Sequence, residues 1–238
     1  MPSAMSNQHF DFKRFRIDQD RCSMKVGTDG VLLGAWFPME RGNNVLDVGC
    51  GTGLVAIMAA QRGAASVTAV EIDPEASQQA FQNAANSEWR DRIFVQCADF
   101  AHFTAEIRFD RIVSNPPYFR DSLRCPDQGR NAARHNDSLS YETLVRCAAP
   151  LLAPDGLLCV VLPYDAVGEF TKCASAFDLN LCLETDVVTA PGKQPKRSLL
   201  AYCFGSQGLR NDVLAICGSD GKETSDYIEL VRDFYLKY

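Results

Sequence analysis

The feature that most constrains this chain is a glycine-rich run that directly follows a short apolar stretch. Residues 45–48 read Val-Leu-Asp-Val, and residues 49–53 read Gly-Cys-Gly-Thr-Gly. The apolar stretch predicts a buried strand, and glycine, which has no Cβ, allows a turn tight enough for the backbone to approach a ligand. Leu54 follows, so the spacing is G-x-G-x-G and differs from the G-x-G-x-x-G fingerprint of dinucleotide-binding proteins. The run therefore predicts a strand, a ligand-binding turn and a helix, in that order.

Strand and helix patterns alternate from residue 43 onward, which predicts an α/β fold with a mostly parallel sheet. The last two strands of this series are joined by only about eight residues, too few for a crossover helix, so we expect the last strand to be antiparallel. The seven expected strands cover residues 45–48, 66–71, 92–97, 109–114, 157–162, 181–189 and 198–204. The expected helices between them cover residues 54–62, 74–86, 140–152 and 166–177, with a turn at 155–156 after the third.

We expect a single domain spanning residues 1–238. Its N-terminal extension should contain a hairpin, because apolar and charged side chains alternate over residues 10–22. A short apolar helix should follow, with Thr28 or Asp29 as its cap. The three expected parts are the N-terminal hairpin and capping helix, the core, and a C-terminal strand and helix, at residues 1–42, 43–205 and 206–238.

Composition excludes several classes of function. The net charge of −6 disfavours wholesale electrostatic binding of nucleic acid, although a local basic surface remains compatible with it. No apolar run approaches the roughly 18 residues of a membrane span, and the first ten residues lack the basic and apolar regions of a secretory signal, so we expect a cytoplasmic protein. The ten cysteines occur singly, without a C-x-x-C pair, and the chain has three histidines, so no metal site is expected.

Acidic side chains occur at the ends of three successive expected strands. Asp47 lies just before the glycine run, where it is placed to accept a hydrogen bond from a ligand's ammonium group. Glu71 ends the second strand, where a carboxylate can accept hydrogen bonds from both hydroxyls of a ribose. Asp99 follows the third strand and is placed to accept a hydrogen bond from an adenine amino group. Because ligands bind at the carboxyl ends of strands in open α/β sheets, this order predicts a nucleoside-bearing cofactor.

The most specific motif is Asn115-Pro116-Pro117-Tyr118, which directly follows the strand expected at 109–114. Two prolines fix φ and remove two backbone donors, which leaves carbonyl groups free to face a ligand. The Asn115 side-chain oxygen and the Pro116 carbonyl can both accept hydrogen bonds from one planar amino group. Such bonds localise the nitrogen lone pair for attack on a methyl group, and Tyr118 offers a face on which a base can stack. The motif therefore predicts methyl transfer to an exocyclic amine or to an amide.

The order of these features resembles the class I S-adenosylmethionine-dependent methyltransferases, and the resemblance covers residues 25–205. It implies a Rossmann-like class I methyltransferase fold and S-adenosyl-L-methionine as the cofactor. It also implies that the target nitrogen is held by Asn115, Pro116, Pro117 and Tyr118. The residues implied for cofactor binding are Thr28, Asp29, Asp47, Gly49, Gly51, Gly53, Glu71, Asp99 and Asn115.

Basic residues gather in three places along the sequence. One cluster follows the Asn-Pro-Pro-Tyr motif, one precedes the last core strand, and one lies in the expected N-terminal hairpin. If they meet around the pocket, they form a local basic surface for a polyanion in spite of the net charge. The residues expected to contact RNA are Arg14, Arg130, Arg134, His135, Lys193, Lys196 and Arg197.

Several segments together resemble the bacterial tRNA1(Val) (adenine-37-N6)-methyltransferases, and this resemblance runs nearly from end to end. The segments are the glycine run and residues 25–36, 115–119, 133–135 and 233–237. The resemblance implies N6-methylation of an adenine beside the anticodon of a valine tRNA. That base is unpaired in a loop, so it needs little extrusion from a stack. The implied partner is tRNA, and a monomer is favoured.

The Asn-Pro-Pro-Tyr motif alone leaves other acceptors open, namely a ribosomal RNA base, a DNA adenine or a protein glutamine. Glutamine-methylating release-factor enzymes carry a helical domain before the cofactor loop, and the residues before the loop of this chain do not have that pattern. A non-catalytic S-adenosylmethionine-binding partner protein is the alternative from a different class. The intact set of Asp47, Glu71, Asn115 and Tyr118 argues against it.

Overall fold

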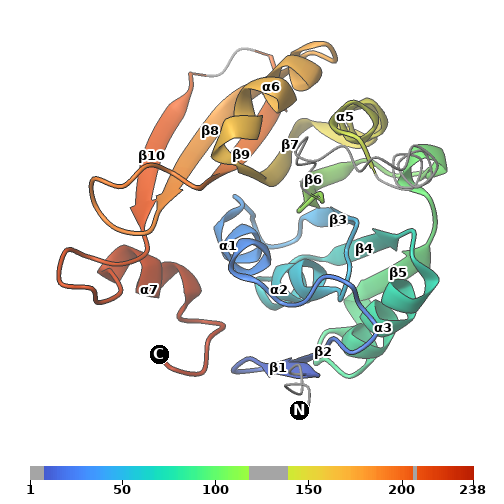
Figure 1. Ribbon diagram of the computed structural model, residues 1–238. Helices are drawn as coiled ribbons and strands as arrows, with labels where there is room; N and C mark the ends of the chain where they lie inside the picture. The colour runs from blue at the N-terminus through green and yellow to red at the C-terminus, as the bar shows by residue number, and fades with distance from the viewer. Residues whose placement is uncertain (1–7, 118–138, 206–207) are drawn as a thin grey trace, which may run out of the picture.

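The computed structural model describes residues 8–117, 139–205 and 208–238. These residues form one eight-stranded sheet and a separate two-stranded sheet (Figure 1). The strands of the large sheet stand in the order β10-β8-β9-β7-β6-β3-β4-β5. In chain order these strands are β3 (Asn44–Val48), β4 (Ser66–Glu71), β5 (Ile93–Cys97), β6 (Phe109–Ser114), β7 (Leu152–Pro163), β8 (Leu179–Val188), β9 (Arg197–Phe204) and β10 (Arg210–Ala215).

Strand directions agree with a mostly parallel sheet. From β5 to β7 every neighbouring pair is parallel, and β10 is parallel to β8. Strand β9 lies between β7 and β8 and is antiparallel to both, as expected for a last core strand reached by a short connection. Because of this reversal, β9 begins at the edge of the sheet where its neighbours end.

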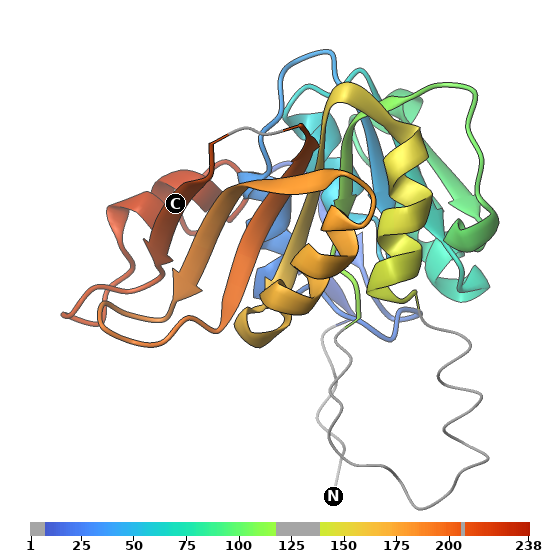
Figure 2. The same cartoon turned by 90° about the horizontal axis from the view of Figure 1, so that it is seen from above.

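Helices cover both faces of the sheet because alternate strand residues point to opposite sides. Helices α1, α2, α3 and α7 share one buried core with residues such as Val113, while α5 and α6 share the other with residues such as Ile112. Figure 2 shows α5 and α6 on one side of the sheet, with α1 and α7 on the other. The helices are α1 (Thr28–Trp36), α2 (Leu54–Gln61), α3 (Pro74–Ala85), α5 (Tyr141–Ala148), α6 (Val167–Ser175) and α7 (Ser225–Val231).

The expected N-terminal hairpin is present as β1 (His9–Asp11) and β2 (Arg16–Asp18), which pair antiparallel. Its Phe12 forms an isolated bridge with Tyr235, and their rings stack with centroids 5.9 Å apart. The chain then runs back along α3, because Asn83 accepts a hydrogen bond from the Asp18 amide (2.9 Å). This path carries residues 22–27 from the hairpin to the ligand edge of the large sheet.

Three details of the fold differ from expectation. The sheet has eight strands rather than seven, because the C-terminal strand β10 adds to it beside β8. Neither Thr28 nor Asp29 caps α1, since both lie inside the helix and the N-cap position belongs to Gly27, which makes no side-chain bond. The turn expected at 155–156 lies within β7, whose pairing with β6 shifts register there.

Among the helices of the described ranges, none has the length and apolar character needed to cross a bilayer.

Candidate active site

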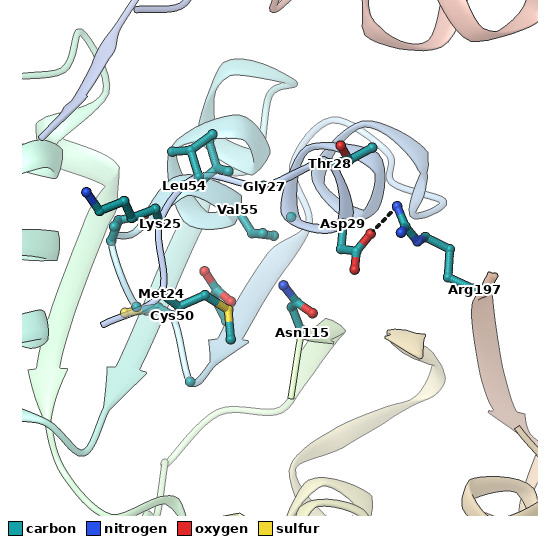
Figure 3. Close-up of a pocket in the computed structure, with 16 residues that line it drawn as sticks. Met24, Lys25, Gly27, Thr28, Asp29, Cys50, Leu54, Val55, Asn115 and Arg197 are labelled. Atoms are coloured by element: carbon teal, nitrogen blue, oxygen red, sulfur yellow. Dashed lines mark ion pairs between the residues drawn. The ribbon is translucent and has the colours of Figure 1, made fainter. Parts of the chain in front are cut away.

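A cavity of about 370 Å³ opens at the carboxyl ends of β3 and β6 (Figure 3). Four separate parts of the chain meet there: the segment before and in the first turn of α1, the loop between β3 and α2, the residue after β6, and the first residue of β9. The lining residues are Met24, Lys25, Val26, Gly27, Thr28, Asp29, Gly30, Asp47, Gly49, Cys50, Gly51, Thr52, Leu54, Val55, Asn115 and Arg197. The glycine run and Asn115 of the Asn-Pro-Pro-Tyr motif therefore share one cavity.

The glycine run has the tight conformation that its sequence predicts. Gly49, Gly51 and Gly53 all have positive φ, at 67°, 53° and 78°, a region that other residues seldom adopt. A Cβ added at Gly49 or Gly51 would meet no atom within 4 Å, whereas one at Gly53 would lie 3.3 Å from the Cβ of Ala80. The first two glycines thus present bare backbone to the cavity, and the third lets α2 begin close to α3.

Asp47 lies in the cavity wall as a buried carboxyl group, with 2% of the residue exposed. Its Oδ2 accepts a hydrogen bond from the Ala56 amide at 3.0 Å, in the first turn of α2. Burial raises the pKa of Asp47 to about 7, with the Glu71 charge adding to the same direction and the Ala56 amide opposing it. A cationic group in the cavity would favour the ionised form, so Asp47 is suited to bind an ammonium group.

Glu71 and Asp99 occupy the strand ends predicted for them, but neither lines the cavity. The Glu71 carboxylate accepts hydrogen bonds from the amides of Gly51 (2.8 Å) and Asp73 (3.0 Å), so it holds the glycine loop against the turn that follows β4. The Asp99 carboxylate accepts a hydrogen bond from the amide of Ala101 (2.9 Å) at the start of a short 3-10 turn. Each carboxylate oxygen can accept more than one hydrogen bond, so these contacts leave room for a ligand. Ribose binding by Glu71 and adenine binding by Asp99 therefore stay predictions.

Asn115 reaches the cavity from the end of β6. The strand end before it is fixed, because the buried Ser114 hydroxyl donates to the carbonyl of Val48 at 2.9 Å. A Cβ added at Gly30 would lie 4.0 Å from Asn115 Nδ2, so the first turn of α1 packs beside the amide. Pro116 is buried and Pro117 exposed, while Tyr118 lies outside the described residues.

The first turn of α1 contributes more to the cavity than its sequence indicated. Thr28, Asp29 and Gly30 all line it, and Asp29 forms an ion pair with Arg197, with 2.5 Å between Oδ1 and Nη1. The sequence predicts Arg197 as an RNA contact, and its predicted cofactor residues include Thr28 and Asp29 but neither Lys25 nor Cys50, which also line the cavity. Cys50 lies between Gly49 and Gly51, and Lys25 begins the segment 25–36 that resembles the family, so these positions were the available signal.

The residues expected to contact RNA are only partly brought together. Lys193 and Lys196 are exposed in the connection between β8 and β9, next to Arg197. Arg14 lies at the opposite edge of the sheet, near the end of α3, where it pairs with Glu88 at 2.6 Å and covers the Trp89 ring. Arg130, Arg134 and His135 lie outside the described residues. Within the described part of the chain, no group of three potential metal-ligating side chains occurs.

Comparison with solved structures defines the class of fold. A predicted O-methyltransferase from Agrobacterium tumefaciens superposes with a TM-score of 0.69 at 21% identity, over 87% of this chain and 96% of that one. A glycopeptide N-methyltransferase, solved in complex with S-adenosyl-L-methionine, superposes with a TM-score of 0.58 at 13% identity, over 76% of this chain and all of that one. The fold is therefore the Rossmann-like fold of methyltransferases.

Sequence comparison narrows the class. The family model of the methyltransferase small domain matches residues 22–169. A tRNA1(Val) (adenine(37)-N6)-methyltransferase of Bacteroides fragilis is 49% identical over 98% of this chain and its own full length. Relatives of the same name from Haemophilus influenzae and Yersinia enterocolitica are 43% and 42% identical, over 96% of this chain and over 99% and 93% of their own lengths. The chain belongs to the tRNA1(Val) (adenine(37)-N6)-methyltransferase family.

Proposed function

We propose that this protein transfers a methyl group from S-adenosyl-L-methionine to N6 of adenine 37 in tRNA1(Val). One observation carries the proposal: the glycine loop and Asn115, from two motifs far apart in the sequence, line a single cavity. The activity named for relatives of up to 49% identity over their full length requires this combination of a cofactor site with an amino-group site. The protein is accordingly an enzyme that modifies RNA.

The residues present fit the cofactor. The cavity volume of about 370 Å³ lies within the usual range of ligand sites, about 300–1,000 Å³. Bare backbone at Gly49 and Gly51 allows close approach, and the buried carboxyl of Asp47 provides a partner for the ammonium group of the methionine part. When bound, S-adenosyl-L-methionine supplies an electrophilic methyl group on a sulfonium.

The protein's contribution to the chemistry is to hold the target nitrogen. The Asn115 side-chain oxygen and the Pro116 carbonyl each accept one hydrogen bond from the exocyclic amine, which directs the nitrogen lone pair into the cavity. The amine becomes acidic only as its new bond to carbon forms, so no strong base is needed beforehand. Positioning then supplies most of the rate enhancement, with Tyr118 proposed as the stacking surface for the base.

The acceptor is proposed to be the anticodon loop of a valine tRNA. A base in a loop is unpaired, so bringing it to Asn115 needs little disruption of stacking. Lys193 and Lys196 lie exposed near the cavity, next to Arg197, and are proposed to contact RNA phosphates together with Arg130, Arg134 and His135. We propose that the protein acts on this tRNA as a monomer in the cytoplasm.

The test is transfer of labelled methyl from S-adenosyl-L-methionine to unmodified total tRNA, followed by nucleoside analysis and isolation of the labelled species. We expect N6-methyladenosine, confined to valine tRNA and lost when adenine 37 is replaced by another base. Ribosomal RNA, DNA and a glutamine-bearing protein serve as competing acceptors. Preferential label in any of these, or label in tRNA at another nucleotide, would overturn the assignment of adenine 37.

A further inference from the structure

The ion pair between Asp29 and Arg197 lies in the wall of the cavity. Its Oδ1 and Nη1 atoms are 2.5 Å apart, and the two side chains are 20% and 25% exposed. Both residues line the cavity. Partial burial distinguishes this pair from surface ion pairs, which usually contribute little to stability. The pair is therefore a partly buried group of charges that a ligand in the cavity can contact.

Arg197 is mounted on a rigid part of the sheet. As the first residue of β9, it pairs with Pro163 of β7 on one side and with Val187 of β8 on the other. Because β9 is antiparallel to these neighbours, its first residue lies at the edge where they end. The reversal of this strand is what brings an arginine side chain to the ligand edge.

Helix α1 holds Asp29 close to Asn115. The neighbouring Gly30 packs tightly on Leu54 and lies beside Asn115: an added Cβ would be 3.3 Å from Cδ2 of Leu54 and at ordinary contact distance, 4.0 Å, from Nδ2 of Asn115. At the far end of α1, the Trp36 indole donates to the Thr185 hydroxyl of β8 at 2.9 Å. Helix α1 is thus held between Asn115 at one end and β8, the neighbour of β9, at the other.

The ion pair and the glycine loop flank Asn115. Figure 3 shows Asp29 and Arg197 on one side of the Asn115 amide, with Cys50 of the glycine loop on the other. Methyl transfer is an in-line displacement, so the donor and the acceptor must occupy opposite sides of the transferred carbon. If the glycine loop holds the donor, the pair faces the nucleotide that carries the amine.

We propose that Arg197 binds a phosphate of the target nucleotide, and that Asp29 is the residue that positions Arg197. This inference rests on the proposed function. A guanidinium has five N–H donors in a planar fork, so one edge can pair with Asp29 while another binds phosphate oxygens in a charge-assisted contact. Asp29 then serves RNA recognition through Arg197 and is not a contact to the cofactor.

The experiment uses the full chain with an RNA of the valine anticodon stem-loop, and compares Asp29→Asn, Arg197→Gln, Arg197→Lys and the double variant Asp29→Asn/Arg197→Gln. Three quantities are measured for each: the Kd for S-adenosyl-L-methionine by calorimetry, and the kcat and the KM for the RNA. The matched control is Arg210→Gln, an exposed arginine at the start of β10, which pairs with Leu183 of β8 and so lies toward the other end of the strands from Arg197, whose partner in β8 is Val187.

Arg197→Gln should lower kcat/KM for the RNA by about ten- to a hundredfold, the usual value of a hydrogen bond to a charged group. Arg197→Lys should recover little of this, because lysine keeps the charge but lacks the fork. Asp29→Asn should cost about threefold to tenfold, mostly in KM, and the double variant should lose no more than Arg197→Gln alone, because both act through one contact. Cofactor Kd should stay unchanged throughout.

Three results would overturn the inference: additive losses in the double variant, weaker cofactor binding in Asp29→Asn that accounts for its loss of activity, or kinetics of Arg197→Gln like those of the Arg210→Gln control. Failure of the proposed function is separable from all of these, because it would show in the unmodified protein as absence of N6-methyladenosine in the RNA.

Discussion

The two halves of the cavity are built in different ways. The half that we propose holds the cofactor is local: Asp47 near the end of β3 and Gly49 and Gly51 in the loop after it belong to one continuous segment. The half that we propose holds the acceptor is assembled from three distant segments, which supply Asp29, Asn115 and Arg197. The local half depends mainly on backbone conformation, and the assembled half depends on side chains placed by sheet topology. Substitutions should therefore separate cofactor binding from turnover according to the half in which they fall.

Asn115→Ala should have the largest effect and should be confined to turnover. Removing one positioned hydrogen-bonding group from an active site lowers kcat by about 10²–10³-fold, and Asn115 is the motif side chain that the structure places in the cavity. Cofactor Kd by calorimetry should change little, because the glycine loop and Asp47 are untouched. Asn211→Ala, at an exposed position of β10, is the control. Loss of cofactor binding in proportion to activity would place Asn115 in the cofactor half instead.

Glu71→Gln should have the opposite profile, with weaker cofactor binding and near-normal turnover at saturation. The carboxylate accepts hydrogen bonds from the Gly51 and Asp73 amides at 2.8 and 3.0 Å, so its loss loosens the glycine loop. We expect Kd to rise about ten- to a hundredfold, since hydrogen bonds to charged groups have this value. Glu75→Gln, an exposed carboxylate in the first turn of α3, is the matched control. Unchanged affinity in Glu71→Gln would show that loop order does not depend on this clamp.

What the sequence predicted follows the same division. The expected strands at 66–71 and 109–114 have the bounds of β4 and β6, because apolar runs and turn residues are local signals. The glycine loop was predictable for the same reason, since positive φ and backbone exposure are properties that glycine supplies by itself.

The acceptor half was less predictable because its contacts are created by topology. Nothing near Arg197 in the sequence indicates that β9 inserts between β7 and β8 and so meets Asp29 from α1. Arg14 was grouped with the other basic residues by charge alone, and the structure places it beside Glu88, outside the cavity lining. Its place beside Glu88 is set by the path of the N-terminal segment along α3, a tertiary feature that sequence spacing does not contain.

Asp47 should make cofactor binding depend on pH, with a smaller effect than the two substitutions above. Burial raises its pKa to about 7, so the carboxyl is protonated at lower pH and cannot attract an ammonium group. Affinity should therefore rise by up to about tenfold per pH unit below 7 and level off above about 8, as linkage requires. Calorimetry between pH 6 and 8 measures this directly. Asp47→Asn should remove the slope, and Asp110→Asn, at the other end of the β3–β6 pair, should keep it.

The same pKa shift has a defined sign for folding stability. The folded pKa of Asp47 lies above the ordinary value of 3.8, so the group favours the folded state at low pH, and this contribution is lost as the pH rises toward 7. Asp47→Asn removes that loss, so its Tm relative to the unmodified protein should increase between pH 4 and pH 7. A Tm difference that does not vary with pH would mean that Asp47 is not the titrating group.

Ser114→Ala should have the smallest effect, and it tests whether the two halves are mechanically joined. The Ser114 hydroxyl donates to the Val48 carbonyl at 2.9 Å, which ties the strand before Asn115 to the strand before the glycine loop. Ser87 makes an equivalent buried bond to the Ala84 carbonyl at 2.7 Å, far from the cavity. Each alanine variant should lose about 1 kcal/mol of unfolding free energy, the usual net value of one hydrogen bond. Only Ser114→Ala should also lower kcat, by a few-fold. The reason is that only the Ser114 bond sets the distance between the site of the methyl donor and the site of the methyl acceptor. Equal kcat in both variants at equal loss of stability would show that Asn115 is held by α1 rather than by β3.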